Sequence, residues 1–508
     1  MIGTTQMHRA RYAEAGTLIG LILLAFALRV WILKTLTLIE TDGVSYVAIA
    51  QRFQSTGSPF DPLFHPLYPL WIAVLQPFLG DYEYTGRMVS ALFGAGLLVP
   101  AYLFTSALLG RPVAMLSSVL LAIHPGLVMS GASVLCEATY MFFLVSGVWM
   151  AWLSVVRRQW TLAAFAGGIF GLAYLARPEG ALYFLAFLVV TVIMQVRSGA
   201  SLKWMWGTLG AMFLFLLVTA PYLLYLHDTL GYWTLSGKIT HVLAQDLGIA
   251  VTANQSDLSA FIAHGLSVAK QFVVNVFVWM KYVVGDLFPG ALILFLLPGI
   301  LAGLRDGGWK YREGVLLGAA LPPFATLAFH VESRVFLPTL PFLLPLTALG
   351  VIAMARWGAR ETAARAWTLG LALLAIVTVL PFTLRPLVRP NIEGVLYQQA
   401  AHWIATTQPS DAILMDRKPY VAYYSGRRFV PLSSVNPEEL AHAVQHTGAR
   451  LLILDSRVLA DRPLLFPLLY GLPPAGLELL WELDAGDTGR IRILEIRDRT
   501  LRAGARRS

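Results

Sequence analysis

The residues of this chain best suited to chemistry are carboxylates and arginines close to long apolar runs. Asp42 follows the first apolar run, and Glu137, Glu179, Arg177 and Arg334 stand at the edges of later runs. Charged groups near a hydrocarbon phase are costly, so each is expected to have a partner or a function. Arginines can hold a phosphate while a carboxylate handles a hydroxyl. The set therefore predicts a polar cavity that accepts an anionic lipid head group.

Asp42 lies in a polar stretch, residues 38–71, that follows the first apolar run. We expect this carboxylate at the centre of a membrane active site, because loops on a rigid scaffold often carry chemistry. A second interpretation makes Asp42 the N-cap of a helix over 43–54, since Asp is a good capping residue. The two roles are compatible, because capping orients the carboxylate.

Four further side chains are expected to bind substrate in or beside this stretch. Tyr46 stands one helical turn after Asp42, and Arg87 is a base near the end of an outer segment. His65 and Tyr68 lie in the sequence HPLYP, which also fits a rigid elbow. Whether the imidazole of His65 contacts substrate stays open at the level of the sequence.

Four later residues complete the candidate site. Glu137 fits either an acid in a cavity or an interfacial acid favoured by a helix N-terminus. Arg177 and Glu179 fit either substrate binding or a tight turn with a local ion pair. Arg334 begins an apolar run on the side where cations are disfavoured, both by topology and by the helix dipole. This double cost makes Arg334 the strongest candidate for a phosphate ligand.

The composition predicts that these residues are held by a bundle of membrane helices. Apolar residues make up 57% of the 508 and charged residues only 13%, whereas about a quarter of the residues of globular proteins are charged. By the twenty-residue criterion there are about eleven spans. They are expected at 17–37, 88–109, 112–129, 134–155, 160–176, 181–196, 204–226, 287–304, 313–330, 335–356 and 366–384. Arg29 lies inside the first span and is expected to snorkel outward.

The placement of basic residues predicts the topology. Arginines and lysines cluster in alternate gaps, which the positive-inside rule assigns to the cytoplasm. The clusters include Arg111, Arg157–Arg158, Arg197 with Lys203, Arg305 with Arg312, and Arg356 with Arg365. The N-terminus is then cytoplasmic, and the loops at 38–87 and 227–286 face outward. Because the net charge of +9 follows this pattern, it does not indicate nucleic acid as a partner.

The chain is expected to divide into a transmembrane domain over 1–384 and a soluble domain over 385–508. Residues 393–407 have one apolar face, and 451–455 and 490–496 are typical of strands. A capped helix is expected to begin near residues 436–439. The fold class is therefore an α-helical polytopic membrane protein with a small C-terminal α/β domain outside the membrane. An outer-surface helix is expected within 258–284.

The motifs together resemble the GT-C glycosyltransferases, in the bacterial branch related to protein O-mannosyltransferases and the lipid A aminoarabinose transferase. The resemblance covers roughly 15–350. It rests on Arg29, DGVSYVAIA at 42–50, HPLYPLWIA at 65–73, GRMVSALFG at 86–94, LLGRPVA at 108–114, Glu137, LARPEG at 175–180 and SRVFLPTLP at 333–341.

The resemblance implies transfer of a sugar from a polyprenyl-phosphate donor to an acceptor at the outer face of the cytoplasmic membrane. It makes Asp42 the catalytic carboxylate, Glu137 a secondary acid, and Arg334 a ligand of the donor phosphate. Family members often have a second acid directly after this Asp, where the present chain has Gly43. This departure puts a metal-bridging pair of carboxylates in doubt.

Cofactor, acceptor and rival functions stay open at this level. No metal, nucleotide or hydrolase motif is present in the sequence; no cofactor is specified, and a divalent cation is compatible with the acids. The acceptor is a lipid, a glycan or a protein. One rival function is that of a transporter or flippase, a class that usually shows repeated halves. The other is a non-catalytic degenerate homologue, for which Gly43 is the only indication.

Overall fold

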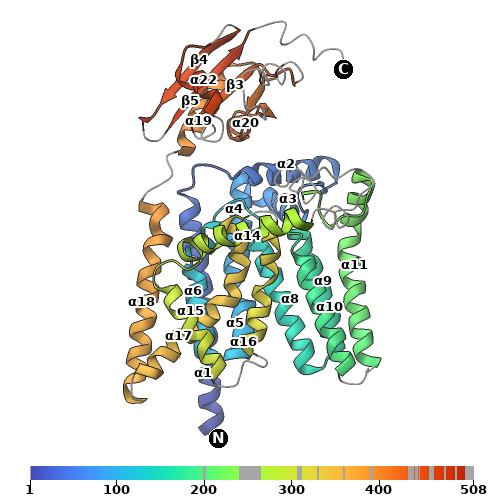
Figure 1. Cartoon of the computed structure of the whole chain (residues 1–508), viewed down its shortest axis with the longest axis vertical. Helices are drawn as coiled ribbons and strands as arrows, with labels where there is room; N and C mark the ends of the chain where they lie inside the picture. The colour runs from blue at the N-terminus through green and yellow to red at the C-terminus, as the bar shows by residue number, and fades with distance from the viewer. Residues whose placement is uncertain are drawn as a thin grey trace. The chain divides into compact units, whose positions relative to one another are not determined.

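The computed structural model forms two compact units, a helical unit and an α/β unit (Figure 1). The helical unit comprises Met1–Leu33 and Tyr46–Arg385, and the α/β unit comprises Lys34–Ser45 and Pro386–Ser508. The structure describes residues 2–197, 202–238, 265–305, 312–328, 331–358, 361–388, 393–432, 440, 444, 447–456, 463–473, 476–486 and 489–497.

The helical unit is built from long apolar helices with short connections. Its elements are α1 (Ile2–Leu33), α2 (Thr41–Thr56, shared with the other unit), α3 (Leu67–Leu79), α4 (Tyr82–Gly96), α5 (Leu98–Leu109), α6 (Arg111–Ile123), α7 (Pro125–Ser130), α8 (Glu137–Arg157), α9 (Trp160–Ala176), α10 (Gly180–Arg197), α11 (Leu202–Leu230), α14 (Gly265–Tyr282), the π-helix η1 (Val283–Leu287), α15 (Leu292–Arg305), α16 (Arg312–Ala320), the 3₁₀ segments η3 (Pro322–Ala328) and η4 (Ser333–Thr339), α17 (Leu340–Gly358) and α18 (Glu361–Val388).

Seven stretches of the described chain are long and apolar enough to cross a membrane: Tyr12–Leu33, Tyr82–Leu109, Glu137–Arg157, Gly180–Arg197, Met205–Leu230, Ser333–Gly358 and Ala363–Val388. Each coincides with an expected span, which confirms the polytopic helical fold class. The other four expected spans are shorter apolar helices: Arg111–Ile123, Trp160–Ala176, Leu292–Gly303 and Gly314–Ala328. A helix of 13 residues, such as α6, rises only about 20 Å, against about 30 Å of hydrocarbon.

Three helices lie across the long ones at one end of the unit. α2, α3 and α14 run at a steep angle to the bundle in Figure 1. α14 lies within the region 258–284, where an outer-surface helix was expected; the first residues of that region are outside the described residues.

Glycines let neighbouring helices approach closely. A Cβ at Gly299 on α15 would overlap the backbone of Leu346 on α17, and one at Gly350 on α17 would overlap the backbone of Phe295. A Cβ at Gly167 on α9 would likewise overlap Ala211 on α11. Small residues at such crossings are how membrane helices gain contact without a hydrophobic driving force between them.

Arg29 is buried in the helical unit, with 1% of its surface exposed. Its guanidinium donates hydrogen bonds to the carbonyls of Ala25, Ala122 and Leu127, at 3.0, 3.3 and 3.4 Å. The expectation that it snorkels outward is therefore wrong. The sequence could not show that carbonyls at the end of α6 and within α7 would lie within its reach.

The α/β unit contains a five-stranded sheet with helices on it. Its strands are β1 (Ile413–Asp416), β2 (Arg428–Pro431), β3 (Leu451–Asp455), β4 (Leu477–Asp484) and β5 (Arg490–Ile496), in the order β2-β1-β3-β5-β4. β1 is parallel to β2 and β3, while β5 is antiparallel to β3 and β4. The helices are α19 (Glu393–Thr407), α20 (Tyr420–Ser425), the short η6 (Pro463–Leu465) and α22 (Phe466–Tyr470).

The two faces of this sheet have separate cores. One face packs residues of α19 and α20, including Leu396, Ala400 and Val421, against Leu414 and Ile453. The other face packs side chains such as those of Leu452, Leu468 and Leu494. The expected helix at 393–407 and the expected strands at 451–455 and 490–496 are confirmed. The helix expected to begin near 436–439 lies outside the described residues.

Candidate active site

A buried carboxylate, that of Glu137, is the centre of a charged cluster in the helical unit. Glu137 is the first residue of α8, where the positive end of the helix dipole favours an acid. Only 2% of its surface is exposed. Its Oε1 lies 2.9 Å from Nη1 of Arg177 and 3.9 Å from Nη1 of Arg334. One carboxylate oxygen of Glu137 thus pairs with two guanidinium groups. The other oxygen, Oε2, is buried with no hydrogen-bond partner in the described part of the chain.

Arg177 reaches Glu137 from the turn between α9 and α10. Its backbone is extended, with φ −154° and ψ 144°, which ends α9. Its Nη2 and Nε also contact Glu179, at 2.9 and 3.2 Å. The guanidinium stands over the ring of Tyr140, 5.8 Å from the centroid. The local ion pair considered from the sequence is present, and so is the pairing with an acid on another helix.

Arg334 enters the cluster from the 3₁₀ segment η4. Its Nε donates to the carboxylate of Glu332 at 2.7 Å. Side-chain exposure is 32% for Arg334 and 45% for Glu332, against 15% for Arg177. Arg334 is therefore the more accessible of the two cations that Glu137 holds.

Opposite charge keeps Arg177 and Glu179 ionised, although burial opposes the ionisation of both. Burial alone would lower the pKa of Arg177, but Glu179 and Glu137 raise it well above its ordinary value. Burial likewise opposes ionisation of Glu179, yet the Arg177 guanidinium holds the pKa of that carboxyl below its ordinary value. Arg177 and Glu179 consequently form an ion pair near neutral pH.

Aromatic side chains surround His65. Its ring lies 5.1 Å from that of Tyr174 and 5.0 Å from that of Tyr222. The residue is 4% exposed. Burial lowers the pKa of His65 to about 3, although Glu179 opposes the shift. The imidazole is therefore neutral.

Tyr46 connects α2 to the residue before Glu137. Its hydroxyl donates to the Sγ of Cys136 at 3.0 Å. Its ring also meets those of Phe64 and Tyr68 edge-on, at 5.3 and 5.0 Å. These contacts place the second turn of α2 beside the start of α8.

Tyr68 and Arg87, also expected to bind substrate, make hydrogen bonds within the fold. The hydroxyl of Tyr68 donates to the carbonyl of Gly86 at 2.8 Å and lies 2.9 Å from the Oγ of Ser90. Arg87 donates to the carbonyl of Leu33 at 3.0 Å and pairs with Glu83 one turn away. Their substrate-binding roles stay predictions.

Asp42 is the second residue of α2, in its first turn, and is half-buried. The helix begins at Thr41, so Asp42 lies inside the first turn and not at the cap position expected from the sequence. A carboxylate there interacts favourably with the helix dipole. It belongs to the α/β unit, whereas Glu137, Arg177 and Arg334 belong to the helical unit.

Three residues of the charged cluster were not predicted as site residues. Glu332 pairs with Arg334, Cys136 accepts from Tyr46, and Tyr140 lies under Arg177. Glu332 could have been found, because it stands two residues before Arg334 at the same edge of an apolar run. The roles of Cys136 and Tyr140 depend on contacts between helices distant in sequence, which no local pattern reveals.

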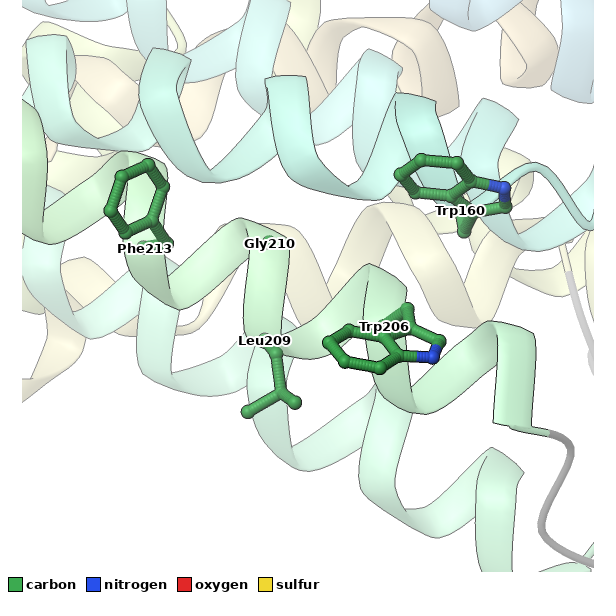
Figure 2. Close-up of a pocket in the computed structure, with 5 residues that line it drawn as sticks. All are labelled: Trp160, Trp206, Leu209, Gly210 and Phe213. Atoms are coloured by element: carbon green, nitrogen blue, oxygen red, sulfur yellow. The ribbon is translucent and has the colours of Figure 1, made fainter.

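A separate groove on the helical unit is apolar (Figure 2). It is lined by Trp160 of α9 and by Trp206, Leu209, Gly210 and Phe213 of α11, with a volume of about 500 Å³. Trp160 begins α9, whereas Arg177 directly follows its last residue. The 17 residues of α9 rise about 25 Å. The groove therefore lies near the opposite end of α9 from the charged cluster and carries no charged lining residue.

Part of the chain is similar to a known protein family. Residues 64–225 match the family described as dolichyl-phosphate-mannose-protein mannosyltransferase. The chain matches none of the curated protein sequences.

Solved structures share the fold. The oligosaccharyltransferase AglB of Archaeoglobus fulgidus, in complex with an inhibitory peptide and a dolichol-phosphate, is 14% identical with a TM-score of 0.63, over 88% of this chain and 70% of that one. ArnT of Cupriavidus metallidurans, bound to undecaprenyl phosphate, is 13% identical with a TM-score of 0.58, over 96% of this chain and 99% of that one.

These likenesses confirm the resemblance predicted from the sequence motifs. The solved structures establish the fold over nearly the whole chain, and the matched family covers the segment from His65 and Tyr68 to Glu137 and Arg177. The chain thus has the fold of these two membrane glycosyltransferases over nearly its whole length, and its residues 64–225 match the mannosyltransferase family.

Proposed function

We propose that this protein transfers a sugar from a polyprenyl-phosphate donor to an acceptor hydroxyl at the outer face of the cytoplasmic membrane. One observation carries the proposal: Glu137 holds the guanidinium groups of Arg177 and Arg334 together. Dolichol-phosphate and undecaprenyl phosphate in the two similar structures support the class of donor.

Arg334 is the proposed ligand of the donor phosphate. Guanidinium groups match phosphate oxygens with two parallel hydrogen bonds. About a third of its side chain is exposed, and its partner Glu332 is more exposed still. An arriving phosphate can therefore displace Glu332, whereas Arg177 is held by both Glu137 and Glu179. Arg177 then adds fixed positive charge close by.

Asp42 is the proposed general base. Its carboxylate accepts the proton of the acceptor hydroxyl as that oxygen forms a bond to the anomeric carbon. The bond between this carbon and the phosphate oxygen breaks, and its electron pair stays on the polyprenyl phosphate. Arg334 stabilises the charge that develops there. A single base with direct displacement inverts the anomeric carbon.

Glu137 is proposed to position the arginines instead of transferring a proton. Its carboxylate is 2% exposed, and one oxygen faces both guanidinium groups. Without the carboxylate of Glu137 between them, the two guanidinium groups would repel each other. His65, Tyr46 and Glu179 are proposed to bind substrate beside this cluster. Electrostatic interaction links His65 to Glu179 and Arg177.

The orientation follows from the helices that carry the cluster. α8 begins at Glu137 and has Arg157 in its last turn, while α10 and α17 have Arg197 and Arg356 in theirs. The positive-inside rule assigns these basic ends to the cytoplasm. The acid–arginine cluster at the other ends then faces outward, as does the α/β unit.

The acids of the cluster fit a divalent cation poorly. Glu137, Glu179 and Glu332 are each paired with a guanidinium. In the described part of the chain there is no group of three His, Cys, Asp or Glu residues that could hold a metal. We therefore expect transfer to continue at about the wild-type rate in excess EDTA; loss of transfer that Mg²⁺ or Mn²⁺ restores would contradict this.

Binding of undecaprenyl phosphate to the purified protein tests the proposed ligand. Arg334→Ala is expected to weaken binding by about tenfold or more, since hydrogen bonds to charged groups contribute about 1.5–3 kcal/mol. Arg52→Ala, which breaks an exposed pair with Asp61, is the matched control and should leave affinity unchanged. Wild-type affinity in Arg334→Ala would contradict the assignment. If the wild-type protein moves label across the membrane but forms no glycosylated product, the transporter is favoured. If it neither transports label nor transfers sugar, the degenerate homologue is favoured.

A further inference from the structure

The start of the first outer loop is part of the α/β unit, although more than 340 residues separate them in sequence. Three hydrogen bonds join them. The side chain of Gln398 donates to the carbonyl of Thr37 at 2.7 Å, and the backbone N–H of Ile39 donates to the hydroxyl of Tyr424 at 2.9 Å. The hydroxyls of Thr41 and Tyr420 lie 2.9 Å apart.

Packing reinforces these bonds. Ile39 is 1% exposed, and Leu38 packs on the core formed by α19, α20 and the sheet. A Cβ at Gly394 would overlap Thr37, so α19 approaches the loop as closely as its backbone permits. The hydrogen bonds fall on residues 37, 39 and 41, the alternation of an extended segment lying on a surface. Residues 37–41 are thus docked along their length and not held at a single point.

The docking surface is itself anchored to the sheet. The ring of Tyr420 meets that of Tyr397 edge-on at 5.1 Å. The hydroxyl of Tyr397 donates to Oδ2 of Asp455, at the end of β3, at 2.9 Å. Asp455 is 3% exposed. A rigid path therefore runs from the sheet through α19 and α20 to Thr41.

Thr41 is the first residue of α2, and Asp42 is the second. Holding Ile39 and Thr41 fixes where this helix begins and so where the Asp42 carboxylate stands. We propose that Tyr420 and Tyr424 are positioning residues for the catalytic carboxylate of Asp42. This inference rests on the proposed role of Asp42 as the base.

Removal of the two hydroxyls tests the inference. Transfer by the full-length double variant Tyr420→Phe, Tyr424→Phe is measured against donor concentration. A misplaced base lowers kcat and leaves donor affinity intact, so we expect kcat to fall by about tenfold to thirtyfold. Donor KM and undecaprenyl phosphate binding should stay within about twofold of wild type. The matched control is Tyr470→Phe, the same change on α22.

A variant from the other side of the contact guards against a folding artefact. Thr41→Val removes the partner of Tyr420, so it should lower kcat by itself and add little further loss to Tyr420→Phe, because residues that share one bond are non-additive. Additive losses, or a double tyrosine variant with wild-type kcat, would overturn the inference.

The failure of the inference can be told from the failure of the proposed function. If Asp42→Asn abolishes transfer while the tyrosine variants keep wild-type kcat, only the positioning role is lost. If Asp42→Asn transfers sugar at the wild-type rate, the proposed function itself is wrong.

Discussion

At the scale of single residues, the site depends on one carboxylate shared by two arginines. Glu137 is buried, and its Oε1 faces Arg177 closely and Arg334 less closely. In the proposed mechanism, Arg334 exchanges partners while Arg177 stays in place. Such an arrangement presents positive charge to a ligand without the cost of two unpaired cations at the membrane.

Glu332 is expected to compete with the donor phosphate for Arg334. Their ion pair is partly exposed, and exposed pairs contribute at most about 1 kcal/mol. Glu332→Gln should therefore lower the donor KM by about twofold to fivefold. Initial rates of transfer against donor concentration provide the measurement. Asp61→Asn, which breaks another exposed pair, is the control; a higher donor KM in Glu332→Gln would show that Glu332 binds substrate.

His65 should make the stability of the protein depend on pH. Its folded pKa is about 3, against an ordinary value of 6.5. Between pH 6.5 and about pH 3, His65 is therefore protonated in the unfolded chain but neutral in the folded protein. The free energy of unfolding decreases as the pH falls through this range. At pH 5 the loss is about 2 kcal/mol relative to pH 7.

Thermal unfolding of the purified protein between pH 5 and pH 7.5 checks this effect. His65→Phe should flatten the pH dependence relative to wild type, because it removes the buried titrating group. His402→Gln changes an exposed histidine and should leave the profile as it is. An unchanged slope in His65→Phe would show that other groups control stability in this range.

At the scale of elements, close contacts between helices decide how the bundle packs. α15 and α17 approach at Gly299 and Gly350, where a Cβ would overlap the backbone of the facing helix. Neither glycine can gain a side chain unless the helices move apart. The contact is thus a packing requirement and not a matter of helix propensity.

Gly350→Ala is expected to destabilise the protein by about 1–3 kcal/mol, as overpacking does. The control is Gly370→Ala on α18, where no atom lies within 4 Å of the added Cβ. That change should be neutral or stabilise by up to about 1 kcal/mol, because alanine favours helix more than glycine does. Thermal midpoints in detergent compare the two. Equal effects would mean that α15 and α17 are not packed this closely.

The elements differed in how far the sequence could predict them. β3 was predicted from the apolar run LLILD, and β5 from the isoleucines that recur through RIRILEI. β4, with the sequence LELLWELD, was missed; it has no β-branched residue, and leucine and glutamate favour helix. The span at α6 was overestimated, because apolar composition continues past Ile123 into the buried residues of α7, whereas the bounds of α9 match the expected 160–176.

Of the candidate site, the sequence could predict residue types but not partners. Charges at the edges of apolar runs identified Glu137, Arg177 and Arg334, because a charge beside hydrocarbon is informative in itself. The sharing of one carboxylate by two arginines depends on how α8, the α9–α10 turn and η4 meet. The docking of Thr37–Thr41 on α19 and α20 depends on a contact across the whole chain.

At the scale of the whole molecule, the membrane topology is the remaining prediction. Native Cys136 is buried and is the only cysteine, so single cysteines can be introduced into a Cys136→Ser background. Asp411→Cys in the α/β unit should react with a membrane-impermeant maleimide in intact cells with a permeable outer layer. Arg157→Cys, at the end of α8 that is predicted to be cytoplasmic, should react only after lysis. The opposite labelling pattern would invert the topology and place the site in the cytoplasm.

The most direct test of the central claim is transfer of labelled sugar from polyprenyl phosphate to membrane and envelope fractions by wild type and Asp42→Asn. Loss of a general base lowers the rate by about 10²–10⁴-fold. We predict a loss of this size in Asp42→Asn with undecaprenyl phosphate binding retained, because Arg334 and Arg177 are untouched. The labelled fraction then identifies the acceptor class. Transfer by Asp42→Asn at the wild-type rate would contradict the claim and leave Asp42 as a residue that only stabilises the first turn of α2.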